Sequence, residues 1–318
     1  MKLSVIIPVF NEVENIPLLH KAIHQALKSV KYSWEMILVD DGSQDNSPEA
    51  LEKLARKDPR YVKVILLRRN FGQTTAIAAG IDHASGDIVV MMDADLQNDP
   101  VDIPGMVAKI DEGYDVVSGW RYERKDNLLR ILPSRLANKL ISWITGVHLH
   151  DYGCTLKAYR REVLSGFRLY GEMHRFIPAY AGSVGAKIIE VRVNHHARKY
   201  GKAKYGLERT TKVILDLMTV KFLSSYASKP NYLFGGLGLI MMAISFLIVI
   251  FLVINRLVAG EHIVRSPLLQ MSVMLFILGV QSILLGLIAE LLVRTYHESQ
   301  KKATYTIRKA FNLKKSSG

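Results

Sequence analysis

Short apolar runs alternate with amphipathic stretches along the first two-thirds of the chain. The apolar runs have strand length and are rich in β-branched residues, and the first stretch between them repeats apolar residues at helical spacing, at Ile16, Leu19 and Ile23. Continuous apolar strands separated by amphipathic helices predict an α/β domain with a mostly parallel sheet covered on both faces. We expect strands at 3–10, 35–40, 62–67, 87–93, 114–119 and 186–195, and helices at 14–30, 47–57, 74–84, 101–113 and 133–146.

Two long apolar runs lie near the end of the chain. No Asp, Glu, Lys or Arg occurs from Pro230 to Asn255 or from Ser266 to Ala289. Each run exceeds the roughly 20 residues that a helix needs to cross a bilayer. Because the polar link between the runs is short, they predict a transmembrane helical hairpin rather than two buried core helices.

These patterns divide the chain into four parts. An α/β domain spans residues 1–206, and an amphipathic juxtamembrane segment with one apolar side follows at 207–229. The membrane hairpin spans 230–294, and a basic tail occupies 295–318.

The chain is strongly basic, with a formal net charge of +13. Lys and Arg flank the hairpin on both outer sides, whereas the link carries only Arg256 and Arg265. The positive-inside rule therefore places both termini in the cytoplasm, and the flanking charge favours anionic lipid headgroups. Nucleic acid is the rival explanation, but no motif resembles a nucleic-acid-binding module, so we expect no such partner. The single cysteine, Cys154, excludes an internal disulfide framework and suits a reducing compartment.

Carboxylates follow two of the predicted strands. Asp40 and Asp41 end one strand in "VDDGS", and Asp93 and Asp95 end another in "MMDADLQ". Either pair alone is compatible with a turn or a helix cap. Together, at the carboxyl ends of neighbouring strands where α/β sheets bind ligands, they predict an acidic cleft. Mg²⁺ and Mn²⁺ prefer oxygen ligands and are often held by carboxylates plus substrate phosphates, so the pattern favours a metal–diphosphate site.

The motifs, in their order and spacing, resemble those of family 2 glycosyltransferases: "VIIPVFNE", "VDDGSQDNS", "RRNFGQ", "MDADLQ" and "SGWRYER". The later "DYGCTLKAYRREV", "RKYGKAKYG" and the apolar hairpin resemble the polyisoprenyl-phosphate branch. That branch includes dolichol-phosphate mannose synthases, and the chain is most similar to its bacterial bactoprenol (undecaprenyl-phosphate) glucosyltransferases. The resemblance covers nearly the whole chain and implies a GT-A nucleotide-sugar-binding fold for residues 1–206.

The resemblance also implies which residues hold the donor and a metal ion. The positions that match nucleoside-binding residues are Pro8, Glu12, Asp40 and Asp41. Asp93 and Asp95 match a DxD pair, in which Asp95 contacts the metal and Asp93 contacts the ribose or the metal. Gln97 completes or supports the metal shell. The metal is Mg²⁺ or Mn²⁺.

Four basic residues match phosphate-binding positions of the family: Arg121, Arg135, Arg198 and Lys204. Guanidinium groups suit phosphate because they donate two parallel hydrogen bonds. Asp151 matches a position where many family members keep a catalytic base. A phosphomonoester acceptor with a second pKa of about 6 is already mostly ionised, so orienting an arginine or positioning the acceptor is an equal alternative. The chain departs from the family at Phe10, usually Tyr, and at Ala203, where many members have Ser.

The resemblance implies an inverting, metal-dependent enzyme that transfers a hexose, glucose from UDP-glucose, to polyisoprenyl (undecaprenyl) phosphate. Transferases of the same branch specific for mannose, an N-acetylhexosamine or aminoarabinose are alternatives. A non-catalytic membrane sensor or scaffold that binds nucleotide sugars is another. A processive polysaccharide synthase would need a channel, and two membrane helices are too few to build one.

We further expect an integral protein of the bacterial inner membrane, with its catalytic domain on the cytoplasmic side. Membrane hairpins of this branch can assemble, which implies a homo-oligomer, a dimer or a tetramer. Gly235, Gly236 and Gly238 would permit close contacts between helices.

Overall fold

The computed structural model describes most of the chain: residues 1–122, 138, 141–142, 145–164, 169, 173–197, 230–259, 266–299 and 305–313. It divides into two compact units. The first comprises Met1–Val220 together with Ala303–Gly318, and the second comprises Lys221–Lys302.

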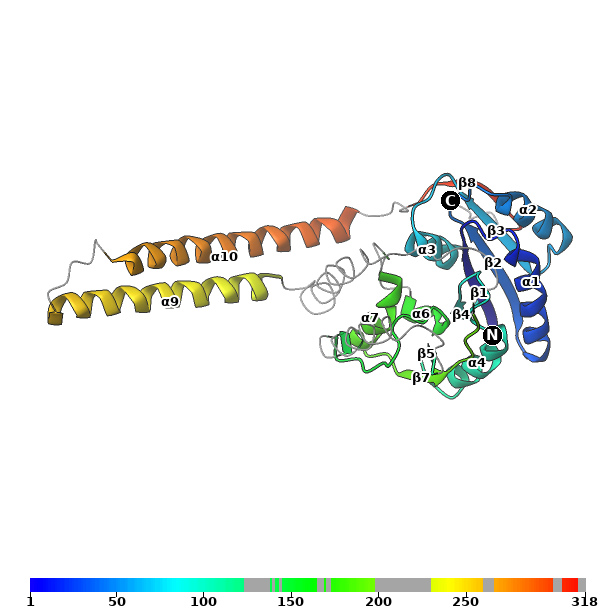
Figure 1. The fold of residues 1–318 in the computed structure, drawn as a ribbon, viewed down its shortest axis with the longest axis horizontal. Helices are drawn as coiled ribbons and strands as arrows, with labels where there is room; N and C mark the ends of the chain where they lie inside the picture. The colour runs from blue at the N-terminus through cyan, green and yellow to red at the C-terminus, as the bar shows by residue number, and fades with distance from the viewer. Residues whose placement is uncertain are drawn as a thin grey trace. The chain divides into compact units, whose positions relative to one another are not determined.

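The first unit is built on one eight-stranded sheet with the strand order β7-β5-β6-β4-β1-β2-β3-β8 (Figure 1). The strands are β1 (Lys2–Val9), β2 (Ser33–Asp40), β3 (Val62–Leu67), β4 (Ile88–Met91), β5 (Val116–Trp120), β6 (Lys157–Arg160), β7 (Ile188–Arg192) and β8 (Ile307–Phe311). The α-helices are α1 (Asn15–Ala26), α2 (Ser47–Lys57), α3 (Gln73–His83), α4 (Ile103–Asp111), α6 (Arg161–Leu164) and α7 (Ile177–Ser183). Short 3₁₀ turns occur at η1 (Leu27–Ser29), η2 (Pro100–Asp102) and η3 (Met173–Arg175).

Strand β1 lies between β2 and β4 and runs parallel to both. The order of strands along the chain reverses there, because β2 and β3 extend the sheet on one side and β4 extends it on the other. Nearly every residue of these four strands is buried, which explains their continuous apolar sequences. The mostly parallel α/β sheet is therefore confirmed, and its switch point lies at the carboxyl ends of β1, β2 and β4.

The sheet also contains an antiparallel strand that we did not expect. Strand β6 inserts between β4 and β5 and runs antiparallel to both. Strand β7 then pairs with β5 in parallel. The antiparallel insertion matters for the site, because the segment that leads into β6 approaches the edge of the sheet where β4 ends.

The C-terminal segment returns to the sheet. Strand β8 pairs antiparallel with β3, and its Phe311 packs on the hydrophobic core. Asn312 donates two hydrogen bonds from Nδ2, to the carbonyl oxygens of Ala55 (2.8 Å) and Val62 (2.9 Å). We expected 295–318 to be a basic tail, whereas five of these residues form an edge strand. This strand covers the edge of β3 that would otherwise be open to pairing with another chain.

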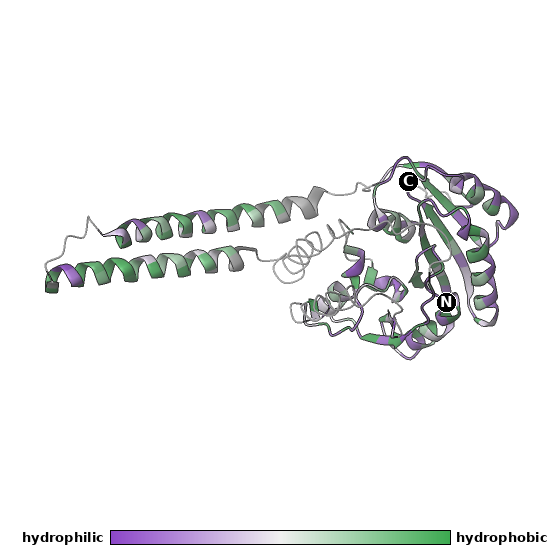
Figure 2. Ribbon diagram, viewed as in Figure 1, coloured by the Kyte–Doolittle hydropathy of each residue, from purple (hydrophilic) through white to green (hydrophobic). Residues whose placement is uncertain are grey.

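The second unit contains two long helices, α9 (Pro230–Ala259) and α10 (Pro267–Ser299). The stretches Phe234–Val258 and Pro267–Ala289 are long and apolar enough to cross a membrane. Figure 2 shows apolar residues along most of both helices. The predicted apolar hairpin is confirmed.

The two helices of the hairpin meet at a pair of glycines. A Cβ atom on Gly238 would lie 2.5 Å from the carbonyl oxygen of Gly279, and one on Gly279 would lie 2.7 Å from the carbonyl oxygen of Gly238. The backbones therefore approach closely, as small residues allow in membranes. Gly238, which we expected to serve contacts between helices, serves the contact within this hairpin. A Cβ atom on Gly236 would have open space around it.

Substitution of Asn312 tests how much strand β8 contributes to the stability of the first unit. Its φ is +59°, in the left-handed region. Asn312→Gly removes the two side-chain hydrogen bonds and should lower the free energy of unfolding by about 1–2 kcal/mol. Asn312→Ala should cost about 1 kcal/mol more, because alanine is strained at this φ. Thermal unfolding in detergent measures the order, with exposed Arg308→Ala as the control. Equal stability of all four proteins would contradict a fastening role for β8.

Candidate active site

Two loops meet at the carboxyl ends of β2 and β3. The Asp41 carboxylate accepts hydrogen bonds from the backbone N–H groups of Phe71 (2.8 Å) and Gly72 (2.9 Å). Burial raises the pKa of Asp41 to about 6, and these hydrogen bonds offset only part of that rise. Gly42 has a φ of +70°, and a Cβ there would collide with the backbone of Arg69. The "VDDGS" turn is thus packed directly on the "RRNFG" loop, and Asp41 fixes that loop.

Asp40 has a different environment from its neighbour. Its Oδ2 accepts a hydrogen bond from the backbone N–H of Ser43 (3.2 Å), but its buried Oδ1 has no hydrogen-bond partner in the described part of the chain. Burial raises the pKa of Asp40 as well. Because a buried, unpaired acceptor is costly, this oxygen suits a donor group of a bound ligand. Asp40, more than Asp41, retains an atom for that role.

The loop after β1 is tied to the loop after β2. The backbone N–H of Glu12 donates to Ser47 Oγ (2.9 Å), and the buried Glu12 carboxylate accepts from Asn15 Nδ2 (2.6 Å). Pro8 lies in β1 opposite Val39 of β2. The four expected nucleoside-binding positions therefore lie on the adjoining ends and loops of β1 and β2.

Asp93 and Asp95 follow β4. Asp93 accepts hydrogen bonds from Gln73 Nε2 (2.7 Å) and Thr155 Oγ1 (2.8 Å), and buried Asp95 accepts one from the backbone N–H of Gln97 (3.2 Å). Leu96, which directly follows Asp95, has a φ of +58°, which is rare for a bulky side chain. Strain of this kind concentrates at functional sites.

Burial, and then the charge of Asp95, raise the pKa of Asp93 to about 6. The positive charges of Arg121 and Arg175 oppose this rise. Two carboxylates that share a partly buried turn are costly because each disfavours the ionised form of the other. A divalent cation relieves both the repulsion and the burial cost, so these residues fit Mg²⁺ or Mn²⁺. The backbone carbonyl of Gln97, the third expected ligand residue, accepts from His196 N–H (2.8 Å).

Arg121 and Asp151 form a two-pronged ion pair. Arg121 Nε lies 2.7 Å from Asp151 Oδ2, and its Nη2 lies 2.9 Å from Oδ1. Both side chains are largely buried, at 15% and 3% exposure. Asp151 Oδ1 also accepts from the backbone N–H of Gly153 (3.1 Å). With both oxygens engaged, Asp151 is well placed to orient Arg121, and a role as base would require breaking this pair.

The segment before β6 and the first residue of that strand carry side chains that we did not assign to the site. Thr155 bonds Asp93, and Lys157 donates from Nζ to the carbonyl oxygens of Tyr152 (3.2 Å) and Cys154. Burial lowers the pKa of Lys157 to about 8. The sequence could have pointed to Gln73 and Thr155, because both lie within the quoted motifs "RRNFGQ" and "DYGCTLKAYRREV". Only the structure shows that both side chains hydrogen-bond to Asp93.

Three expected phosphate-binding residues lie outside the described residues: Arg135, Arg198 and Lys204. Their roles stay predictions. Of the four basic positions, only Arg121 is placed near the acidic pair within the part of the chain that the structure describes.

Similarity to known proteins agrees with this geometry. The sequence profile of Glycosyl transferase family 2 matches residues 4–167. Dodecaprenyl-phosphate galacturonate synthase of Rhizobium johnstonii is 43% identical over 316 residues, covering 98% of this chain and 94% of that protein. Undecaprenyl-phosphate 4-deoxy-4-formamido-L-arabinose transferase of Proteus mirabilis is 37% identical over 315 residues, covering 99% and 95%.

A solved structure shares the fold. Glucosyl-3-phosphoglycerate synthase from Mycobacterium tuberculosis, in complex with Mn²⁺ and UDP-glucose, has a TM-score of 0.54 at 19% identity, over 70% of this chain and 78% of that one. The chain belongs to glycosyltransferase family 2 and has the GT-A-like fold. It is a membrane glycosyltransferase, and it is similar over nearly its whole length to polyisoprenyl-phosphate glycosyltransferases.

Asp93→Asn tests the cost of the acidic pair. The pKa of Asp93 is about 6 in the folded protein against 3.8 ordinarily, so the folded state holds the extra proton between these values. Stability therefore falls as pH rises from about 4 to 6 and stays lowered above. Without metal, Asp93→Asn should raise the free energy of unfolding by about 1–3 kcal/mol at pH 7 and by little at pH 4. The same gain at both pH values would contradict this account.

Proposed function

We propose that this enzyme transfers the sugar of a UDP-sugar to the phosphate of a polyisoprenyl lipid, with inversion at the sugar carbon. The observation that carries the proposal is the juxtaposition of the Asp93–Asp95 pair with an arginine held by Asp151. A diphosphate with its metal requires the first feature, and an anionic acceptor requires the second. The names of the two relatives, which specify dodecaprenyl and undecaprenyl phosphate, support the acceptor class.

The residues of the site have separable tasks in this reaction. Asp40 Oδ1 accepts a hydrogen bond from the nucleoside, and Asp93 and Asp95 hold the cation. When bound, Mg²⁺ or Mn²⁺ neutralises the charge that develops on the leaving diphosphate. Arg121 holds a phosphate oxygen of the donor or the acceptor in line with the sugar carbon. The acceptor oxygen then forms its bond to that carbon as the bond to the diphosphate breaks.

Asp151 acts on Arg121 in this proposal and removes no proton. A lipid phosphomonoester, with a second pKa of about 6, is already mostly a dianion at pH 7. The need is therefore to place the acceptor, which a fixed guanidinium group does well. Arg198 and Lys204 complete the phosphate contacts on the basis of the family resemblance.

The relatives differ from our expectation in the sugar that they transfer. We expected glucose, whereas the relatives are named for galacturonate and for 4-deoxy-4-formamido-L-arabinose. The 43% identical relative favours a hexuronate as the first donor to test, with UDP-glucose and the UDP-linked aminoarabinose derivative beside it.

The hairpin would keep the site beside its lipid substrate. The basic residues on both outer sides of the hairpin favour a cytoplasmic position for the two termini and the catalytic unit. A homo-oligomer remains part of the proposal. The rival is a sensor or scaffold that binds a nucleotide sugar without turnover, and lipid-dependent release of UDP distinguishes the two.

The first test is UDP release by the purified full-length protein in detergent. Release should require undecaprenyl phosphate and Mg²⁺ or Mn²⁺, with one preferred donor. Asp95→Ala should lower the rate more than about 100-fold, because the cation is lost, while exposed Asp111→Ala should not. Binding of UDP-sugars without lipid-dependent release would favour the sensor, and full activity of Asp95→Ala would remove the metal from the proposal.

A double-mutant cycle tests the task of Asp151. If Asp151 acts only by orienting Arg121, then Asp151→Asn combined with Arg121→Ala should be no slower than Arg121→Ala alone. A base would give losses that multiply. The kcat and KM for the lipid phosphate are measured for all four proteins. Multiplying losses in kcat would assign proton transfer to Asp151.

A further inference from the structure

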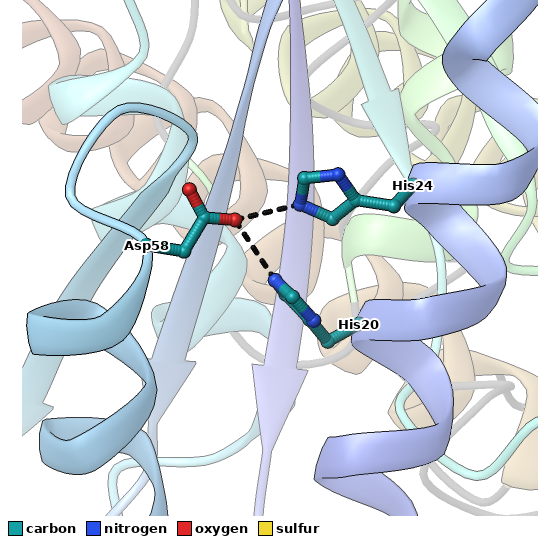
Figure 3. Close-up of side chains that lie close together, drawn as sticks. All are labelled: His20, His24 and Asp58. Carbon is teal, nitrogen blue, oxygen red and sulfur yellow. Dashed lines mark hydrogen bonds and ion pairs between the residues drawn. The ribbon is translucent and has the colours of Figure 1, made fainter.

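Side chains of the types that ligate metals also meet between helix α1 and the end of α2. His20 and His24 are four residues apart and so project from one face of α1, and Asp58 directly follows α2. Nε2 of His20 lies 2.9 Å and Nε2 of His24 lies 2.6 Å from Asp58 Oδ2 (Figure 3). One ligand atom from each of the three residues lies within 4.8 Å of the other two. We call this group the two-histidine cluster.

The two-histidine cluster lies near the end of the sheet at which the parallel strands begin, whereas the acidic pair lies at the end where they finish. Helix α1 starts beside Glu12, at the carboxyl end of β1, and runs back toward the edge where the strands begin. Asp58 precedes β3, which begins at Val62. The Asp93–Asp95 turn instead follows the end of β4. The two groups are therefore separate sites.

The ligand side chains are held in place before any metal binds. The backbone N–H of Asp58 donates to Leu54 O (2.9 Å), and its carbonyl accepts from Val62 N–H (3.0 Å). The ring of His24 packs edge-on against Trp34 and Tyr61, with centroids 4.8 and 5.1 Å away. Little side-chain freedom remains to be lost on binding, and such preorganisation favours affinity.

The three side chains of the cluster are partly buried, and the Asp58 carboxyl is ionised. His20, His24 and Asp58 have side-chain exposures of 21%, 29% and 15%, which leaves a path for an ion. Burial alone would raise the pKa of Asp58, but the hydrogen bonds from the two histidines lower it below its usual value. Asp58 is therefore ionised at neutral pH, as a metal ligand must be.

We propose that His20, His24 and Asp58 bind a divalent transition metal of the zinc type, which ties α1 to the end of α2. Imidazole nitrogen suits Zn²⁺, Ni²⁺ and Cu²⁺, whereas Mg²⁺ prefers oxygen, so this site and the acidic pair select different ions. Two histidines at i and i+4 plus one carboxylate are a known zinc ligand set, with water at the fourth position.

The present distances to Asp58 are those of hydrogen bonds, so the ligand atoms must shift to hold a metal ion. Zinc–ligand bonds of about 2.0–2.2 Å place tetrahedral ligand atoms about 3.4 Å apart. Asp58 Oδ2 must then move about 0.5–0.8 Å away from the two ring nitrogens, relative to the present hydrogen bonds of 2.9 and 2.6 Å. Metal binding replaces the two Nε2–H hydrogen bonds to Asp58. Each ring then carries its proton on Nδ1, which leaves Nε2 free to bind.

The test measures Zn²⁺ binding to the full-length protein in detergent, purified without a polyhistidine tag. It is done in an Asp95→Asn background, so that the acidic pair does not hold the ion. We expect one Zn²⁺ per chain, a higher melting temperature at saturation, and a Co²⁺ adduct with the visible absorption of a four-coordinate site. Mg²⁺ at the same concentration should produce none of these.

Two variants and one control make the outcome decisive. His24→Gln and Asp58→Asn should each weaken Zn²⁺ binding at least tenfold and remove the rise in melting temperature. His83→Gln, which removes an imidazole from α3, should change neither. Absence of binding, or binding unchanged in both variants, would overturn the proposal and leave the cluster a hydrogen-bonded clamp. Asp58→Asn retains an acceptor oxygen, so it decides the case if His24→Gln fails to fold. The readouts do not involve sugar transfer, so their failure is distinct from failure of the proposed function.

Discussion

Burial of carboxylates at the carboxyl ends of parallel strands is the constraint on which the site depends. Strands β1, β2 and β4 are buried on both faces, so the chain leaves the sheet from a dry interior, and Asp41 and Asp93 have raised pKa values as a result. Each carboxylate is then stabilised by donors from another segment: backbone N–H groups of the "RRNFG" loop for Asp41, and Gln73 and Thr155 for Asp93. A cation and a diphosphate would complete this compensation.

The antiparallel insertion of β6 supplies the other half of the site. By entering between β4 and β5 in the reverse direction, β6 draws the segment 151–156 to the end of β4. Thr155 can therefore donate a hydrogen bond to Asp93, and Asp151 can form its ion pair with Arg121, which follows β5. A wholly parallel sheet would have delivered that segment to the opposite edge. The acidic and basic halves of the site therefore depend on one change of strand direction.

The path of the chain joins its two units twice. The chain leaves the first unit after residue 220, forms the second unit, and returns to the first unit at residue 303. Strand β8 then completes the sheet at β3, with Asn312 bonded to Ala55 and Val62. Removal of the C-terminus would thus affect the catalytic unit, although the sequence there resembles a simple basic tail. The two-histidine cluster links α1 to Asp58, the residue that follows α2.

The sequence by itself determined the α/β class, the succession of the first strands along the chain, the apolar hairpin and the acidic motifs. Each of these is a local pattern: apolar periodicity, run length, or carboxylates next to a strand. The sequence wrongly placed the two acidic pairs on neighbouring strands, because β1 lies between β2 and β4. Tertiary structure decided what depends on contacts between distant segments. In the folded chain, the Asp41 carboxylate accepts hydrogen bonds from the loop at Phe71, and Asp40 Oδ1 has no hydrogen-bond partner among the described residues. Tertiary structure also paired Asp151 with Arg121 and turned Ile307–Phe311 into an edge strand. No local sequence pattern predicts these contacts, because the partners are far apart in the chain. Arg121 and Asp151 are 30 residues apart, and more than 200 residues separate β8 from β3.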